Sequence, residues 1–338
     1  MMNHLYRVLP PLAPDYAGAC AVMYELGGLV LIHDASGCTV NYVSFDEPRW
    51  HEKPGMVYCS GLTEIDAVMG NDDVLIDKAI KAAEELHPAF IAYVGSSVPL
   101  IVGTDFNGIA AETEARSGIP CFGFECSGIR SYIEGASNAL LALTRRFCGE
   151  KTESRGTLLL GQLPLDDNGT DASAQVKDLF PDLRASLCFD CTLDDLKQAQ
   201  NAEKAVVVSA AGVKTAQYLQ EQYGIPYTVG LPLPAVQKPH GSVLVVGEDV
   251  RAQSLANALG NADALDLYGT SGLCRYHTRE EEEIMRIAAG YDNVIADPCF
   301  KALCQGNFVS MPSYSVSGGL FASTVSPVDP EAIDELLK

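Results

Sequence analysis

The apolar residues of this 338-residue chain come in short runs that alternate with amphipathic stretches along nearly its whole length. Four-residue runs such as 29–32 and 157–160 are typical of buried strands, whereas 72–86 and 132–147 have the spacing of helices with one apolar face. Buried strands that alternate with helices indicate parallel sheets covered by helices. The sequence therefore predicts an α/β fold with mainly parallel sheets.

This pattern stops and starts again twice. A polar segment at 149–155 follows the first series of elements, and a Pro- and Gly-rich stretch at 230–241 follows the second. Such breaks are typical of linkers between domains. We expect three Rossmann-like units, formed by residues 1–150, 151–237 and 238–338.

The charge of the chain excludes some classes of partner. Lys and Arg total 23 and Asp and Glu total 44, which gives a net charge of −21. This charge repels phosphate backbones, so we expect no nucleic-acid partner. No apolar run reaches the roughly 18 residues of a membrane span, and the first residues lack the apolar core of a secretory signal. We therefore expect a cytoplasmic protein that does not bind membranes.

Common catalytic motifs are missing from the sequence. No Gly-x-Gly-x-x-Gly follows the first strand of a unit, and neither a Walker-type loop nor a His-Glu-x-x-His pair occurs. ATP hydrolysis is therefore not expected of this chain. Cys188 and Cys191 have the spacing of a redox pair, but they lack the surroundings of a thioredoxin-like site. We expect these two thiols to pack in the core.

The eleven cysteines are the side chains of this sequence that most suggest metal binding or redox chemistry. In a reducing compartment most of them are expected to be core residues. Cys20, Cys38 and Cys59 differ, because they stand beside small residues in segments that we expect to be loops at strand ends. Thiolates in such loops can reach a shared metal, and iron–sulfur clusters are held by thiolates. Their separations of 18 and 21 residues match no compact ferredoxin motif.

Several segments of the first 130 residues carry a family resemblance. They are similar to motifs of the nitrogenase component 1 superfamily, which includes nitrogenase subunits, cofactor-assembly scaffolds, dark-operative protochlorophyllide reductase and a nickel-tetrapyrrole reductive cyclase. The matching segments are residues 17–20, 33–38, 63–70, 102–105 and 126–128. The resemblance implies the three-unit fold of this superfamily and an iron–sulfur cluster, [4Fe–4S] in type, bound by Cys20 and Cys38.

The sequence also departs from the family pattern. The third cluster cysteine of the family corresponds to Ser97 in this chain. Either Cys59 supplies the missing ligand, or Ser97 ligates through its oxygen, or this ligand is absent. The cysteine that anchors the iron–molybdenum cofactor in nitrogenase would fall near Ser209 and Ala210. No cysteine is there, so we expect no iron–molybdenum cofactor.

The resemblance implies a reductase component. It would relay low-potential electrons from a separate ATP-dependent iron protein, through the cluster, to a small-molecule or tetrapyrrole-like substrate. Because a [4Fe–4S] cluster usually takes four thiolates, we expect a homodimer that shares the cluster. The substrate cavity is expected between the second and third units, at loops that follow strands. Its candidate residues are Ser209, Gly212, Gly247 and Glu248, and no catalytic residue is assigned.

Two other functions remain open at this point. A scaffold or carrier would hold a metallocluster or a tetrapyrrole for transfer to another protein, without turnover. A ligand-binding protein of the periplasmic type also stacks α/β units around a cleft, although the segment at 33–38 counts against it. In the simplest alternative, the cysteines only pack and the chain is an inert relative.

Overall fold

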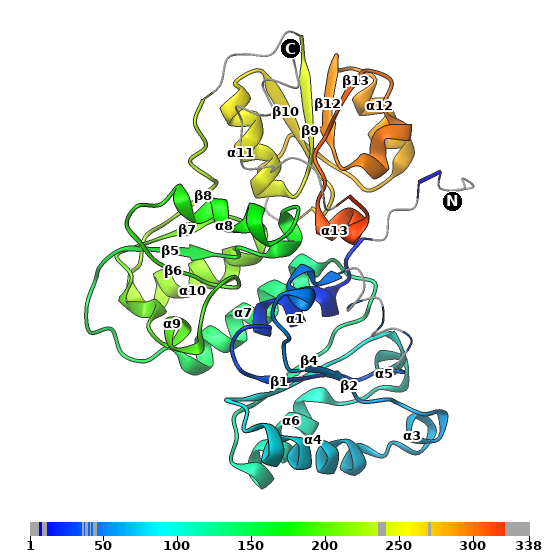
Figure 1. Ribbon diagram of the computed structural model, residues 1–338, viewed down its shortest axis with the longest axis vertical. Helices are drawn as coiled ribbons and strands as arrows, with labels where there is room; N and C mark the ends of the chain where they lie inside the picture. The colour runs from blue at the N-terminus through cyan, green and yellow to red at the C-terminus, as the bar shows by residue number, and fades with distance from the viewer. Residues whose placement is uncertain are drawn as a thin grey trace.

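Three separate parallel sheets form the framework of the protein. The computed structural model describes residues 7–8, 12–35, 37, 40, 42, 46–235, 241–269 and 272–321. The sheets follow one another along the long axis of the molecule (Figure 1). The predicted α/β fold with three parallel-sheet units is therefore confirmed. Within the described residues, no helix has the length and apolar character needed to cross a membrane.

The first sheet has four strands in the order β2-β1-β3-β4, all parallel. They are β1 (Leu29–Ile32), β2 (Val57–Cys59), β3 (Ile91–Val94) and β4 (Cys121–Phe124). One face packs on α4 (Asp72–Leu86) and α6 (Phe106–Ser117), and the other on α1 (Asp15–Met23) and α7 (Tyr132–Phe147). The short helices α3 (Glu64–Met69) and α5 (Ser97–Val102) contact each other.

The second sheet has the order β6-β5-β7-β8 and is also parallel. Its strands are β5 (Thr157–Leu160), β6 (Leu183–Ser186), β7 (Lys204–Val207) and β8 (Tyr227–Val229). The surrounding helices are α8 (Thr170–Asp178), α9 (Leu193–Lys197) and α10 (Val213–Tyr223), with the 3₁₀ turns η3 (Pro164–Asp166), η4 (Ala199–Asn201) and η5 (Ala210–Gly212). The turn η2 (Pro48–His51) belongs to the first part of the chain.

The third sheet has five parallel strands in the order β11-β10-β9-β12-β13. They are β9 (Val243–Gly247), β10 (Ala262–Asp266), β11 (Tyr276–His277), β12 (Asn293–Ala296) and β13 (Asn307–Ser310). The helices α11 (Asp249–Leu259) and α12 (Glu281–Ala288) cover opposite faces. The turn η6 (Pro298–Leu303), helix α13 (Tyr314–Ser317) and turn η7 (Gly318–Phe321) complete this unit.

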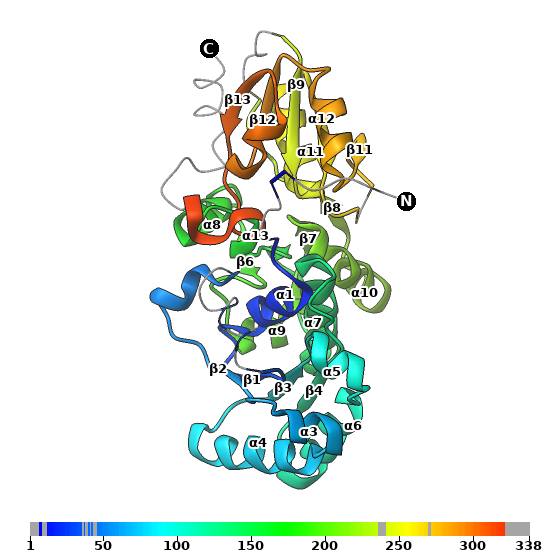
Figure 2. The same ribbon diagram turned by 90° about the vertical axis from the view of Figure 1, so that its right-hand side faces the viewer.

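The helices α1 and α7 lie side by side between the first sheet and the other two units (Figure 2). Their backbones approach closely because each helix has a glycine at the contact. A Cβ atom on Gly18 would lie 1.9 Å from the carbonyl oxygen of Tyr132, and one on Gly135 would lie 1.8 Å from that of Asp15. Only glycine fits at these two positions.

The helix α1 corrects an expectation for Cys20. This residue was expected in a loop, but it lies inside α1, and all nine residues of this helix are buried. A helix that is buried on every side has no amphipathic periodicity, so its sequence pattern could not reveal it. The three-residue strand β2 was also not expected.

The glycine contact gives a testable prediction. We expect Gly135→Ala to lower the free energy of unfolding by about 2–3 kcal/mol in urea unfolding, because the added methyl group forces two helix backbones apart. Gly149→Ala is the control, since a Cβ there lies 3.9 Å from the nearest atom, Nε2 of Gln200. Equal stability of Gly135→Ala and the wild type would contradict the close packing.

Candidate functional site

The carboxyl edge of the first sheet collects most of the residues that the sequence singled out. Because the four strands are parallel, the segments that follow them emerge at the same edge. Residues 33–38 follow β1, Cys59 ends β2, Ser97 comes three residues after β3, and Cys126 comes two residues after β4. Cys38 itself lies outside the described residues.

Hydrogen bonds tie the segments after β1 and β2 to each other. The Cys59 thiol donates to the carbonyl oxygen of Asp34 at 3.3 Å, and His33 Nδ1 lies 2.8 Å from Ser60 Oγ. Leu62 N also donates to the Asp34 carbonyl at 2.8 Å. The Asp34 side chain is buried, and its Oδ2 has no hydrogen-bond partner in the described structure. Cys59 is thus fixed next to the segment that carries Cys38.

Ser97 belongs to a second group of contacts at this edge. Its hydroxyl donates to the carbonyl oxygen of Ser127 at 2.8 Å. The buried Asp15 carboxylate, at the start of α1, accepts from the backbone N–H groups of Ser127 at 2.7 Å and Gly128 at 2.8 Å. These bonds join the first turn of α1, the loop after β4 and the first turn of α5.

Cys20 is fully buried in α1 and close to Cys126. Burial raises the pKa of the Cys20 thiol well above its usual value. The neighbouring Cys126 and the carboxylates of Glu47 and Asp46 raise this pKa further. The thiol therefore stays protonated at neutral pH unless a metal ion replaces the proton.

No sequence motif connects Cys126 with Cys20. Cys126 lies in one of the family-like segments, at 126–128, but it was not among the predicted cluster ligands. Burial raises its pKa as well, and Asp15 raises it further. The proximity of two thiols that are far apart in the sequence depends on how α1 packs on the sheet, which no motif encodes.

The described part of one chain does not by itself gather a complete cluster site. Within it, one group of three side chains has metal-ligating atoms within 4.8 Å of one another, and it contains no cysteine. That group is Asp249, Asp266 and His277 in the third unit. Its carboxylates accept backbone hydrogen bonds, among them those from Cys274 N at 2.8 Å and Tyr268 N at 2.7 Å. These bonds anchor the chain around the loop that follows β10.

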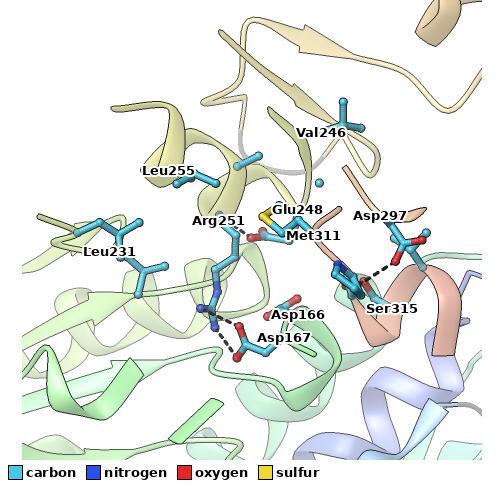
Figure 3. Close-up of a pocket in the computed structure, with 16 residues that line it drawn as sticks. Asp166, Asp167, Leu231, Val246, Glu248, Arg251, Leu255, Asp297, Met311 and Ser315 are labelled. Carbon is cyan, nitrogen blue, oxygen red and sulfur yellow. Dashed lines mark hydrogen bonds and ion pairs between the residues drawn. The ribbon is translucent and has the colours of Figure 1, made fainter. Parts of the chain in front are cut away.

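A second candidate site lies between the second and third units (Figure 3). It is a cavity of about 30 Å³, roughly the volume that one water molecule takes in the liquid. Its polar lining comes from segments that follow strands of the second and third sheets, namely Asp166, Asp167, Glu248, Arg251, Asp297, Ser313 and Ser315. We call it the junction cavity.

Two of the four predicted cavity residues, Gly247 and Glu248, line the junction cavity. Ser209 and Gly212 are buried beside it, at the end of β7, and are not among its lining residues. A Cβ on Gly212 would lie 2.5 Å from the carbonyl oxygen of Leu160, so this glycine serves close packing. The Ser209 hydroxyl is buried without a hydrogen-bond partner in the described structure.

Hydrogen bonds and ion pairs link the units around this cavity. Arg251 Nη1 lies 3.1 Å from Asp167 Oδ1, and Nη2 donates to Oδ2 at 3.3 Å. The Tyr132 hydroxyl, from the first turn of α7, donates to Asp166 Oδ1. Glu248, the N-cap of α11, accepts from the backbone N–H groups of Arg251 and Ala210, both at 2.9 Å. Side chains of α7, η3 and α11 therefore meet here.

The junction cavity is rich in acid groups with shifted pKa values. Burial raises the pKa of Asp166, of Asp167 and of Glu248 above the usual carboxyl range. Arg251 opposes this shift at both aspartates. Perturbed carboxyl groups around a cavity are typical of functional sites. The arrangement can hold and release protons.

Comparisons with known proteins support a common ancestry for most of the chain. The family model "Nitrogenase component 1 type Oxidoreductase" matches residues 14–234. The nitrogenase molybdenum-iron protein alpha chain of Clostridium pasteurianum is 24% identical over 229 residues, which is 63% of this chain and 42% of that protein. The cofactor biosynthesis protein NifE of Rhodobacter capsulatus is 27% identical over 243 residues, 63% of this chain and 48% of that protein. The chain thus spans less than half the length of these two relatives.

Solved structures match the fold over the whole chain. The structure "Nitrogenase Cp1 at pH 6.5" has a TM-score of 0.69 and 14% identity, and the match covers 100% of this chain and 93% of the other. "Nitrogenase Cp1 at pH 5" has a TM-score of 0.61 and 16% identity, with coverage of 93% and 78%. Because the family model matches well over half of the sequence and the three-unit fold agrees, this chain belongs to the nitrogenase component 1 type oxidoreductase family.

Proposed function

We propose that the protein is an electron-transfer reductase of the nitrogenase component 1 type. It takes low-potential electrons from a separate, ATP-dependent iron protein, passes them through an iron–sulfur cluster in the first unit, and delivers them to a substrate at the junction cavity. One observation carries the proposal: the packed pair α1 and α7 joins both sites. Cys20 lies on α1, and Tyr132 on α7 donates a hydrogen bond into the junction cavity.

The cluster is assigned to the carboxyl edge of the first sheet. Proteins of this family bind iron–sulfur clusters, and we assign Cys20, Cys38 and Cys59 as ligands of a [4Fe–4S] cluster here. Ser97 is a weaker candidate than Cys59, because its hydroxyl is already engaged with Ser127 and an alcohol ligates iron less readily than a thiolate. When bound, the cluster supplies one-electron transfer. The chain's own part is to bury Cys20 beside the acidic Asp46 and Glu47.

An exposed apolar surface next to this edge supports a homodimer. Val68 on α3 is 84% exposed, Ile101 on α5 is 83% exposed, and Ile129 after β4 is 79% exposed. Further exposed apolar residues on the same two helices are Ile65, Met69, Val98, Leu100 and Val102. Large exposed apolar patches mark interaction sites. A second copy of the chain on this surface would add its own thiolates to a shared cluster.

The electron donor is proposed to be a separate protein. The sequence has no phosphate-binding glycine loop, and proteins of this family work with an iron protein partner. We assign ATP hydrolysis to that partner. Its docking surface is proposed near the cluster, around residues 34–42 and 71–73.

The volume of the junction cavity limits the size of the substrate that it can hold. A volume of about 30 Å³ admits a molecule of only a few atoms. A tetrapyrrole-like substrate enters only if the third unit moves away from the second and breaks the Arg251–Asp167 ion pair. The loop at 209–212 holds no cysteine, so we propose no anchored iron–molybdenum cofactor.

A scaffold function is the second candidate. The relatives include NifE proteins of Rhodobacter capsulatus and Rhizobium meliloti, whose name assigns them to iron–molybdenum cofactor biosynthesis. A scaffold of this kind would bind a metallocluster and hand it to an acceptor, whereas a reductase would turn over substrate. A scaffold releases its metallocluster, whereas a reductase releases a reduced product and keeps its cluster.

Turnover separates these two functions. We expect the reconstituted protein to reduce a candidate unsaturated substrate when an iron protein and ATP are present. It should keep its own iron throughout. The measurement is product formation together with the iron content before and after. Release of the metal to an apo-acceptor without product would favour the scaffold instead.

Thiolate ligation gives a second prediction. Anaerobic reconstitution with iron and sulfide should give a coloured protein, with roughly four irons per dimer if Cys20 and Cys38 alone ligate a shared [4Fe–4S] cluster and roughly eight if Cys59 ligates as well. We expect Cys20→Ala and Cys38→Ala to lose both iron and visible absorbance. Cys121→Ala is the matched control, because Cys121 lies at the opposite, amino end of β4. A colourless wild-type protein would refute the cluster.

The apolar surface gives a third prediction. We expect Ile101→Asp to convert the dimer to a monomer in sedimentation experiments, because a charge in an apolar interface loses its water on association. Leu320→Asp is the control, since Leu320 is also exposed but belongs to the third unit. If both variants stay dimeric, the contact between copies lies elsewhere.

A further inference from the structure

We propose that Asp166 and Glu248 each hold a proton at neutral pH and donate it to the substrate that is reduced in the junction cavity. This inference rests on the proposed function, because the electrons of the reaction come from the cluster in the first unit. It adds the second requirement of a reduction, a source of protons beside the substrate.

The environment of Asp166 favours the neutral acid. The residue is buried, and its Oδ1 accepts a hydrogen bond from the Tyr132 hydroxyl. Its Oδ2 is buried and has no hydrogen-bond partner in the described structure. Burial strongly disfavours the charged carboxylate, and a proton on Oδ2 removes the charge. The nearby Ser209 hydroxyl and Arg251 lower the pKa of Asp166, but burial is the larger effect. The proton on Oδ2 lies beside a cavity that the side chain itself lines.

Glu248 faces the same cavity from the third unit. Its two oxygens accept backbone hydrogen bonds from Arg251 and from Ala210, both at 2.9 Å. Each oxygen keeps a further lone pair, so the group can carry a proton without losing these bonds. The two acids approach the cavity from different units, Asp166 from η3 and Glu248 from the start of α11.

The balance of charge leaves both acids without a counterion. Four buried carboxyl groups, those of Asp166, Asp167, Glu248 and Asp297, line the cavity with one guanidinium, that of Arg251. Arg251 is paired with Asp167 through two contacts, at 3.1 and 3.3 Å. Neither Asp166 nor Glu248 forms an ion pair within the described part of the chain. Protons therefore neutralise them.

A bound metal ion would be the other way to neutralise these charges. Within the described ranges, the cavity carboxyls do not form a group of three ligand atoms within 4.8 Å of one another. A divalent cation holds several oxygen ligands at about 2.0–2.6 Å from the ion, so these oxygens lie within about 5 Å of one another. The spacing of Asp166, Asp167 and Glu248 therefore favours protons over a metal.

The electrostatics agree with this geometry. Burial raises the pKa of both acids, and the charge of Asp166 raises that of Glu248 further, while Arg251 lowers both. The other titratable groups that face the pair are Tyr132 on α7, Asp167 after η3, Tyr268 after β10, Cys274 before β11 and Asp297 after β12. None of these groups carries a positive charge.

The proposed step reduces an unsaturated bond of the substrate. The bond would receive two electrons from the iron protein, passed one at a time in two successive transfers through the cluster, and one proton from each acid. One O–H bond breaks in Asp166 and one in Glu248, and two bonds to hydrogen form on the substrate. Both carboxylates then regain protons from solvent water before the next turnover. The substrate class is a compound that accepts two electrons and two protons.

Infrared spectroscopy of the full-length protein tests, without turnover, whether Asp166 and Glu248 are protonated. We expect the wild type at neutral pH to show a protonated-carboxyl band that shifts in D₂O, and the isosteric variants Asp166→Asn and Glu248→Gln each to lose part of it. Glu203→Gln, at an exposed position, should leave the band unchanged. The same band in the wild type and in both cavity variants would overturn the proposal.

Stability against pH gives an independent readout. Above the ordinary carboxyl pKa of about 4, the unfolded chain releases protons that native Asp166 and Glu248 retain. The native state then binds more protons than the unfolded state, so the wild type should lose stability as the pH rises from about 5 to 7. We expect a flatter slope in the double variant Asp166→Asn/Glu248→Gln. If the stability of the wild type and of the double variant depends on pH with the same slope, the proposal that these acids retain protons is wrong.

Turnover then tests delivery to the substrate. We expect each variant to lower kcat by about 100-fold, a typical loss for a general acid, while the iron protein still reduces the cluster at the wild-type rate. Normal kcat in both variants would overturn the donor role. If the wild type shows the infrared band but no turnover with any iron protein, the proposed function is wrong. The inference that Asp166 and Glu248 hold protons at neutral pH is then still supported.

Discussion

The close contact between α1 and α7 is the constraint on which the arrangement of the units depends. Gly18 and Gly135 let the two backbones touch, and the pair then packs on the first sheet and on the second unit. Ala13 N donates to the carbonyl oxygen of Ser315 at 2.8 Å, which ties the start of α1 to the third unit. A larger residue at either glycine would force the two helix backbones apart.

The same helix pair explains why the protein has two chemical regions rather than one. On its first-sheet side, Cys20 comes close to Cys126, and both thiols are held neutral by burial. Toward the other units, Tyr132 reaches Asp166 in a cavity where acids outnumber bases. One region suits a metal that displaces protons from thiols, and the other suits groups that keep their protons. Electron and proton chemistry are thereby separated by one layer of helices.

The regular elements were predictable where their sequences carry a period. Strands such as β1 and β5 and amphipathic helices such as α4 appear where the apolar pattern placed them. The helix α1 was missed because it is buried on every side, and β2 because three residues are too short for a periodic signal. Cys59 was found because it stands beside small residues. The proximity of Cys20 and Cys126 was not found, since residues of distant segments meet only through packing.

The sequence by itself determined the fold class, the three units and the family, because hydrophobic periodicity and motif spacing are local properties of the chain. It also placed Gly247 and Glu248 at the end of a strand, where parallel sheets bind ligands. Only the tertiary structure decided that Asp166, Asp167 and Arg251 share a cavity with Glu248 and that Ser209 and Gly212 lie behind it. Charge balance in a buried site depends on which side chains converge from different units, and that convergence is a property of packing.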